Sequence, residues 1–114
     1  MGFSEHHFLT PEGLSLYYRN YGADGDVVVC LPGLTRNSKD FHEIATHLSS
    51  RYRVMCPDMR GRGQSDRDSD WHNYHPATYI NDTWGLVDHL GIGKFIILGT
   101  SLGGLMAMLS LIHI

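Results

Sequence analysis

The stretch that most constrains this chain runs from Lys94 to Leu105 and reads Lys-Phe-Ile-Ile-Leu-Gly-Thr-Ser-Leu-Gly-Gly-Leu. It begins with aromatic and branched residues without polar alternation, which is typical of a strand covered on both faces of a parallel sheet. The apolar run ends at Gly99-Thr100-Ser101-Leu102-Gly103, which matches the pattern G-x-S-x-G. The stretch therefore predicts a buried strand that turns sharply into a helix at Ser101.

The glycines on either side of Ser101 have a steric reason. In a tight turn that presents a nucleophile, the residues two positions away press against strand and helix, so a residue without a Cβ fits best. Gly99 and Gly103 meet this need. Unpaired N–H groups and the dipole of the following helix would stabilise an oxyanion there. Ser101 is therefore a candidate nucleophile.

Three other interpretations explain the same residues. The pattern can be a plain glycine-rich turn, or the serine can do no more than cap the helix. A membrane span is also allowed, because Phe95 to Ile114 is 20 residues without a formal charge and contains G-x-x-x-G. Three glycines, Thr100 and two serines interrupt that run, however, and no basic cluster follows it. A buried strand followed by a buried helix accounts for it better, so we expect no membrane insertion.

Composition places the chain among ordinary globular proteins. With 114 residues, of which 42% are hydrophobic and 18% charged, it forms one domain at most. A net charge of −3 gives no electrostatic footprint for nucleic acid. Interleaved charges predict a solvated mixed-charge surface, formed by Arg51, Arg53, Arg60, Arg62 and Arg67 with Asp58, Asp66, Asp68 and Asp70.

The two cysteines do not indicate a disulfide framework. Cys30 and Cys56 each lie in an apolar, strand-like segment, where free cysteines usually pack as small hydrophobic residues. The N-terminal residues lack the basic start and apolar run of a secretory signal, so we expect a cytoplasmic location.

The order of the elements predicts a parallel sheet. Strands alternate with helices after an initial hairpin, which favours right-handed crossovers with helices on the faces of the sheet. Ligands of such sheets bind outside the carboxyl ends of the strands, where Ser101 and the Pro32-Gly33 loop are expected. The predicted elements are strands Glu5 to Leu9, Leu14 to Asn20, Val27 to Leu31, Tyr52 to Pro57 and Lys94 to Leu98, and helices Asp40 to Ser50 and Thr78 to Leu90, with a further apolar helix after Ser101.

Side-chain spacing predicts the buried faces of these elements. In the second strand, Leu14, Leu16 and Tyr18 form one apolar face. Ser38 or Asp40 can cap the first helix. Its predicted apolar face consists of Phe41, Ile44, Ala45 and Leu48, and that of the second helix of Ile80, Trp84, Val87 and Leu90, with Gly91 as the stop.

Three segments, in this order, resemble the α/β-hydrolase family: Leu31-Pro32-Gly33, Pro57 to Ser65, and Gly99 to Gly104. The similarity spans roughly residues 14 to 110 and is closest to the esterase, enol-lactonase and carbon-carbon-bond hydrolase branch. It implies a small-molecule ester, lactone or related carbonyl substrate, and neither a metal nor an organic cofactor.

The resemblance also assigns roles to residues. It implies Ser101 as the nucleophile and the backbone N–H groups of Leu34 and Leu102 as the oxyanion hole. Family members often carry histidine where this chain has Pro32, but the donor comes from Leu34, so the hole survives. Related dehalogenases and epoxide hydrolases place aspartate at the position of Ser101, and the serine therefore favours acyl chemistry.

The loop from Asp58 to Ser65 is expected to be structural. We predict that Arg60 and Asp58 tie the ends of this loop together, and that its glycines allow the tight path.

A serine hydroxyl needs a base, and that base needs an orienting acid. In this family the chain order is Ser, then Asp or Glu, then His. The thirteen residues after Ser101 include no acid, and their one histidine, His113, would lie about 18 Å along a helix axis. The upstream histidines are expected on the surface or in loops: His6, His7, His42, His47, His72, His75 and His89.

We therefore predict that residues 1–114 are the N-terminal part of a single α/β-hydrolase domain, an incomplete α/β fold without the cap, the later strands, and the acid and base of the triad. Such a chain should have negligible turnover. The apolar edge at Phe95 to Leu98 would be open and could support self-association. The alternative is a non-catalytic binding or regulatory fragment, or a truncation product.

Overall fold

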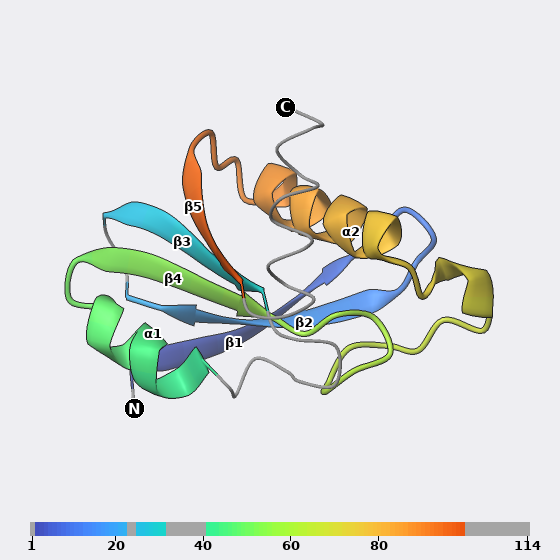
Figure 1. Cartoon of the computed structure of the whole chain (residues 1–114), viewed down its shortest axis with the longest axis horizontal. Helices are drawn as coiled ribbons and strands as arrows, with labels where there is room; N and C mark the ends of the chain where they lie inside the picture. The colour runs from blue at the N-terminus through green and yellow to red at the C-terminus, as the bar shows by residue number, and fades with distance from the viewer. Residues whose placement is uncertain (1, 23–24, 32–40, 100–114) are drawn as a thin grey trace.

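In the part of the chain that the structure describes, five strands form one mixed sheet, with a helix on each face (Figure 1). The computed structural model describes residues 2–22, 25–31 and 41–99. Their elements are β1 (Phe3–Leu9), β2 (Ser15–Tyr21), β3 (Asp26–Leu31), α1 (His42–Leu48), β4 (Tyr52–Pro57), the 3-10 helix η2 (Trp71–Asn73), α2 (Pro76–His89) and β5 (Phe95–Gly99).

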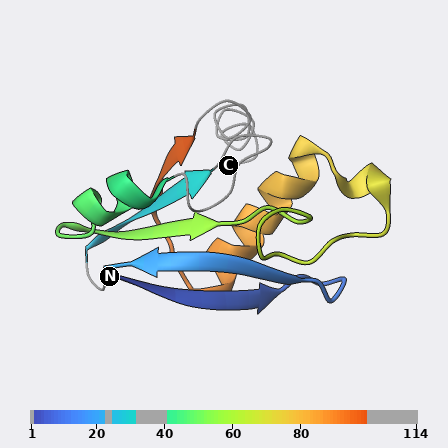
Figure 2. The ribbon, with the colours of Figure 1, turned by 90° about the horizontal axis from the view of Figure 1, so that it is seen from below.

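The strand order is β1-β2-β4-β3-β5, and Figure 2 shows it from one edge of the sheet to the other. Strand β1 pairs antiparallel with β2, and β2 pairs antiparallel with β4. Strand β3 lies between β4 and β5 and is parallel to both. The predicted hairpin and the three predicted parallel strands are confirmed.

The register aligns the carboxyl ends of the parallel strands. Val29 of β3 pairs with Met55 of β4, and Leu31 at the end of β3 pairs with Gly99 at the end of β5. The segments that follow these strands in the sequence therefore begin at the same edge of the sheet.

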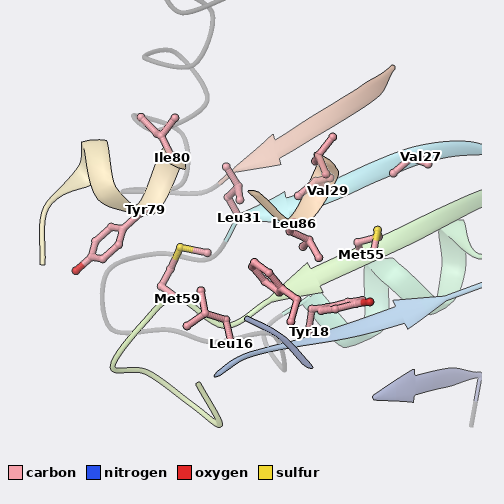
Figure 3. Packing of buried hydrophobic residues seen from close by; sticks show 12 residues of the cluster. Leu16, Tyr18, Val27, Val29, Leu31, Met55, Met59, Tyr79, Ile80 and Leu86 are labelled. Atoms are coloured by element: carbon pink, nitrogen blue, oxygen red, sulfur yellow. The ribbon is translucent and has the colours of Figure 1, made fainter. Parts of the chain in front are cut away.

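Strands β3 and β4 are buried on both faces because neither face has polar alternation, whereas β5 is only partly buried. Toward α2, side chains of β2, β3 and β4 pack with Ile80, Leu86 and Val87 (Figure 3). Toward α1, the cluster consists of Tyr21, Val28, Cys30, Phe41, Ala45, Val54 and Cys56. Both cysteines are free and buried, as predicted.

Strand β2 is covered on both faces, not only on the predicted apolar one. Leu16 and Tyr18 pack toward α2, but Tyr17 and Arg19 on the opposite face are also buried. Arg19 is accommodated because the Phe3 ring lies 4.1 Å from its guanidinium carbon and two tyrosine hydroxyls accept its hydrogen bonds.

Helix α1 is shorter than predicted. It begins at His42 after Phe41, which makes no side-chain capping bond; the predicted caps Ser38 and Asp40 lie outside the described residues. Phe41 and Ala45 are buried as predicted, but Ile44 is 43% exposed, so its place on the buried face was wrong. A helix of seven residues buries only a narrow stripe against the sheet.

Helix α2 begins earlier than predicted. Pro76 lies in its first turn, and His75 is the N-cap, whose side chain accepts a hydrogen bond from the Ala77 N–H. Ile80 and Val87 are buried, and Trp84 and Leu90 pack against the same cluster, as predicted. Gly91 follows with a φ of 68°, the left-handed conformation that ends helices.

Within the described parts of the chain, no helix is long and apolar enough to cross a membrane. Phe95–Gly99, the start of the alternative membrane span, is a strand in the sheet.

Candidate active site

The candidate nucleophile and its predicted oxyanion donors follow strand ends that lie side by side. Ser101 and Leu102 come shortly after β5, and Leu34 shortly after β3. All three residues lie outside the described residues. The described part of the site is thus its support, namely the ends of the parallel strands and the loop after β4.

The loop after β4 is held by two residues at its ends. The Asp58 carboxylate accepts a hydrogen bond of 2.9 Å from the Gln64 N–H, and the Ser65 hydroxyl donates to the Asp58 carbonyl at 2.7 Å. Ser65 also accepts from the Tyr17 N–H at 2.8 Å, which joins the loop to β2. The predicted tie through Asp58 is confirmed.

Gly63 is required by the path of this loop. Its φ of 52° is left-handed, and a Cβ at this position would collide with the Asp58 carboxylate. The glycine thus lets Asp58 reach across the loop and close it.

Arg60 joins the loop to the rest of the protein. Its side chain is 1% exposed and binds the Asp82 carboxylate of α2 in a bidentate manner, Nε to Oδ2 at 2.8 Å and Nη2 to Oδ1 at 2.5 Å. Nη1 donates to Asp68 at 2.8 Å and to Glu12 at 3.2 Å. One guanidinium therefore links the first hairpin, the loop after β4 and α2.

The carboxylates around Arg60 differ in their proton affinity. Burial raises the pKa of the Asp82 carboxyl, and Arg60 opposes that shift. The Asp70 backbone N–H, the Asn73 amide and Arg60 together lower the pKa of Asp68. A backbone hydrogen bond lowers the pKa of Glu12. These groups form a scaffold in which each charge has a partner.

The predicted mixed-charge surface is wrong for this network. Arg60 and Asp58 are buried, and Asp82, which the sequence reasoning did not select as a partner, is 7% exposed. The alternation of charges along the loop does not reveal that Arg60 pairs with Asp82, a residue of α2 that lies 22 positions later in the sequence. The available signal was the place of Asp58 and Arg60 directly after an apolar strand and just before Gly61 and Gly63.

A second group of polar side chains lies between the loop and α2. His72 Nδ1 is 2.8 Å from Asp70 Oδ1, and both side chains are more than half exposed. The Trp71 ring stacks on the imidazole with 3.8 Å between centroids and is itself 74% exposed. The sequence reasoning placed His72 in a surface loop but did not see its carboxylate partner.

The other described histidines are also exposed, as predicted. His75 caps α2, and His42 accepts from or donates to the Tyr21 hydroxyl at 2.8 Å. Across residues 2–22, 25–31 and 41–99, no group of three or more histidine, cysteine, aspartate or glutamate side chains could hold a metal ion.

Comparison with known proteins agrees with this architecture. A family model described as the alpha/beta hydrolase fold matches residues 26–112. A 3-hydroxybutyrate-oligomer hydrolase of Cupriavidus necator is 40% identical over 103 residues, which cover 88% of this chain and 35% of that protein. A 2-(acetamidomethylene)succinate hydrolase of Mesorhizobium japonicum is 33% identical over 90 residues, which cover 79% of this chain and 31% of that protein.

Among solved structures, an alpha/beta hydrolase from Novosphingobium aromaticivorans superposes with a TM-score of 0.94 at 43% sequence identity. The match covers 98% of this chain and 40% of that chain. The chain thus spans about a third of the length of these curated relatives.

Proposed function

Because the chain belongs to the α/β-hydrolase fold family, we propose that it carries the nucleophile of a serine hydrolase, with Ser101 attacking the substrate carbonyl. The observation that carries this proposal is the G-x-S-x-G pattern, which begins at Gly99, the last residue of β5. Gly99 pairs with Leu31, the last residue of β3. Leu102, next to the serine, and Leu34, after β3, would then donate backbone N–H groups to one oxyanion.

The proposed substrate is an ester, a lactone or a related carbonyl compound. Attack by a serine oxygen gives an acyl-serine intermediate, which water then hydrolyses. The Cupriavidus necator relative supports this class, because oligomers of a hydroxy acid are joined by ester bonds. Epoxide hydrolases of Siraitia grosvenorii are also similar, at 30% identity, but the serine at position 101 favours acyl transfer over epoxide opening.

We propose further that residues 1–114 alone have no serine-dependent turnover. The sequence after Ser101 contains no aspartate or glutamate, so the acid that would orient a histidine base is missing from its usual place in the chain order. Without a base, the serine hydroxyl is a weak nucleophile.

A chimaera tests the proposal. Residues 1–114 would be joined to the part of the Novosphingobium aromaticivorans hydrolase that this chain does not match, since the two superpose closely. We expect the chimaera to hydrolyse 4-nitrophenyl esters and its Ser101→Ala form to lose activity by on the order of 10⁴-fold or more.

The rival function is a non-catalytic binding or regulatory role. A folded chimaera whose turnover is unchanged by Ser101→Ala, and which a fluorophosphonate does not label at Ser101, would support that rival. The unextended chain and its Ser101→Ala form are expected to hydrolyse the same esters at equal rates.

A further inference from the structure

The tautomer of His72 follows from its partner. An aspartate carboxylate only accepts hydrogen bonds, so at 2.8 Å the Nδ1 of His72 must carry the proton that it donates to Asp70 Oδ1. In the neutral ring Nε2 is then left with the free lone pair. With the side chain 68% exposed, this lone pair belongs to an accessible nucleophile whose orientation a carboxylate fixes.

The segment that carries this pair is anchored to the core. Asp70 accepts from the backbone N–H of His72 at 3.1 Å, and its own N–H donates to Asp68 at 2.9 Å. Asp68 in turn binds the Asn73 amide at 2.7 Å and the buried Arg60 at 2.8 Å. The imidazole and its carboxylate are therefore held by a chain of hydrogen bonds that ends in the interior of the protein.

Trp71 adds an aromatic surface beside the imidazole. Its ring is 74% exposed although it is the largest apolar side chain in the segment. One face stacks on His72, and the exposed remainder offers a place where an aromatic group can stack beside the ring nitrogen. An activated ester with an aromatic leaving group fits such a surface.

We propose that Asp70, Trp71 and His72 form a second site, independent of Ser101, that hydrolyses activated aryl esters through an acyl-histidine intermediate. Asp70 orients the imidazole and stabilises its positive charge, His72 is the nucleophile, and Trp71 stacks on the aryl group. The activity belongs to the chain as it stands, because it needs no residue beyond the described ones.

The steps balance without any co-reactant except water. The Nε2 lone pair attacks the ester carbonyl carbon, the bond to the aryl oxygen breaks, and an acyl-imidazolium and an aryl oxide form. Water then attacks the acyl carbon, the bond between carbon and Nε2 breaks, and the acid leaves as carboxylate with release of two protons, one of which balances the aryl oxide formed in the first step. His72 returns to its neutral form with Nδ1–H still bound to Asp70.

The first test measures 4-nitrophenyl acetate hydrolysis by the Ser101→Ala chain, with His72→Gln and His47→Gln added separately. His47 is the matched control, since it is an exposed histidine for which the described structure gives no carboxylate partner. If all eight histidines acted alike, each change would remove about one eighth of the rate. We expect His72→Gln to lower the rate at least about fourfold and His47→Gln to have little effect. Equal small losses would overturn the proposal.

The second test separates the roles of the partners. Asp70→Asn keeps a side chain that can accept hydrogen bonds but removes the negative charge. It should lower the rate of ester hydrolysis in the Ser101→Ala chain, and it should cause no further loss of rate when His72→Gln is already present. Trp71→Ala should raise KM for the aryl ester more than it lowers kcat, and Trp71→Phe should restore KM. Rapid acid quench followed by mass spectrometry should find the acyl group on His72. An Asp70→Asn effect that persists in the His72→Gln background, or acylation spread over all histidines, would contradict the site.

Discussion

The guanidinium of Arg60 binds both carboxylate oxygens of Asp82, and both side chains are buried. The two residues lie in different elements, Arg60 in the loop after β4 and Asp82 in the middle of α2. Because the same guanidinium also binds Asp68, the conformation of the loop depends on the position of the helix.

Arg60→Ala should strongly destabilise the protein. The change leaves the Asp82 carboxylate buried without its cation, and breaking a buried pair from one side costs about 3–5 kcal/mol. Arg67→Ala is the matched control, because Arg67 is an exposed arginine of the same loop and should change stability by no more than about 0.5 kcal/mol. Urea unfolding measures both; similar small effects would show that the buried pair contributes little.

Asp68 should make the free energy of unfolding depend on pH in the acid range. Its pKa is lower in the folded protein than its ordinary value of 3.8, chiefly because the Asp70 N–H donates to the carboxylate, with Asn73 and Arg60 contributing. A carboxyl with a lowered folded pKa stabilises the protein above its unfolded pKa, and this contribution is lost as the pH falls through the folded one.

The test compares the free energy of unfolding at pH 6 and near pH 3 in wild type and Asp68→Asn. The variant should be less stable at pH 6 and should lose less on acidification. Burial raises the pKa of Asp82, which acts with the opposite sign, so the difference between the two proteins and not the total pH dependence is diagnostic. Asp88→Asn, at an exposed position of α2, serves as control. Parallel pH profiles for wild type and Asp68→Asn would contradict the assignment.

Two glycine-to-alanine changes should have opposite signs. Gly63→Ala forces a left-handed residue and a Cβ that collides with Asp58, which should cost about 1–3 kcal/mol. Gly85→Ala lies within α2, where the added Cβ would meet only Phe8 at 3.9 Å, and should stabilise by about 0.5–1 kcal/mol. Thermal unfolding of both variants checks the pair. A neutral Gly63→Ala would mean that the loop has another path.

The sequence was sufficient for the succession of strands and helices along the chain, because apolar runs and glycine turns are local signals, and their alternation indicated that β3, β4 and β5 are parallel. The run Val27 to Leu31 cannot alternate, so its burial on both faces followed directly. Ion pairs between residues far apart in the sequence could not be predicted. Asp82 is an example, because the sequence of a helix does not distinguish a carboxylate that faces solvent from one that binds Arg60. The exposure of Ile44 could not be predicted either, because it results from the short length of α1, which covers only a small part of the sheet.

The candidate site could be predicted only as far as its strand ends. The pairing of Leu31 with Gly99 confirms that the segments bearing Leu34 and Ser101 begin at one edge. The roles of Ser101, Leu34 and Leu102 stay predictions, since these residues lie outside the described ranges. The pair of Asp70 and His72 was not predicted, because a spacing of two residues in a loop does not determine whether the two side chains meet.

Cys30 and Cys56 should be inert toward thiol reagents in the native protein. Both are fully buried, and a hydrogen bond with Cys30 together with burial raises the pKa of the Cys56 thiol. Because the thiolate is the reactive form, labelling by Ellman's reagent should be slow in buffer and complete for two thiols in guanidinium chloride. Ser50→Cys, which adds an exposed thiol, should give one rapid equivalent under native conditions. Rapid native labelling of the wild type would show that the face under α1 opens readily.

Ile96→Lys should reduce self-association. Among the described strands β5 pairs only with β3, its sequence carries no charge or proline, and Ile96 is 52% exposed. An open apolar edge of this kind is a template for pairing with a second copy, and a lysine on it is a common natural safeguard. Ile44→Lys removes an apolar side chain that is 43% exposed from α1 and leaves the edge unchanged. Sedimentation velocity over a range of concentrations should therefore show weaker association for Ile96→Lys than for Ile44→Lys. If the two variants reduced self-association equally, exposed apolar side chains in general would explain the association, and the edge of β5 would have no special role.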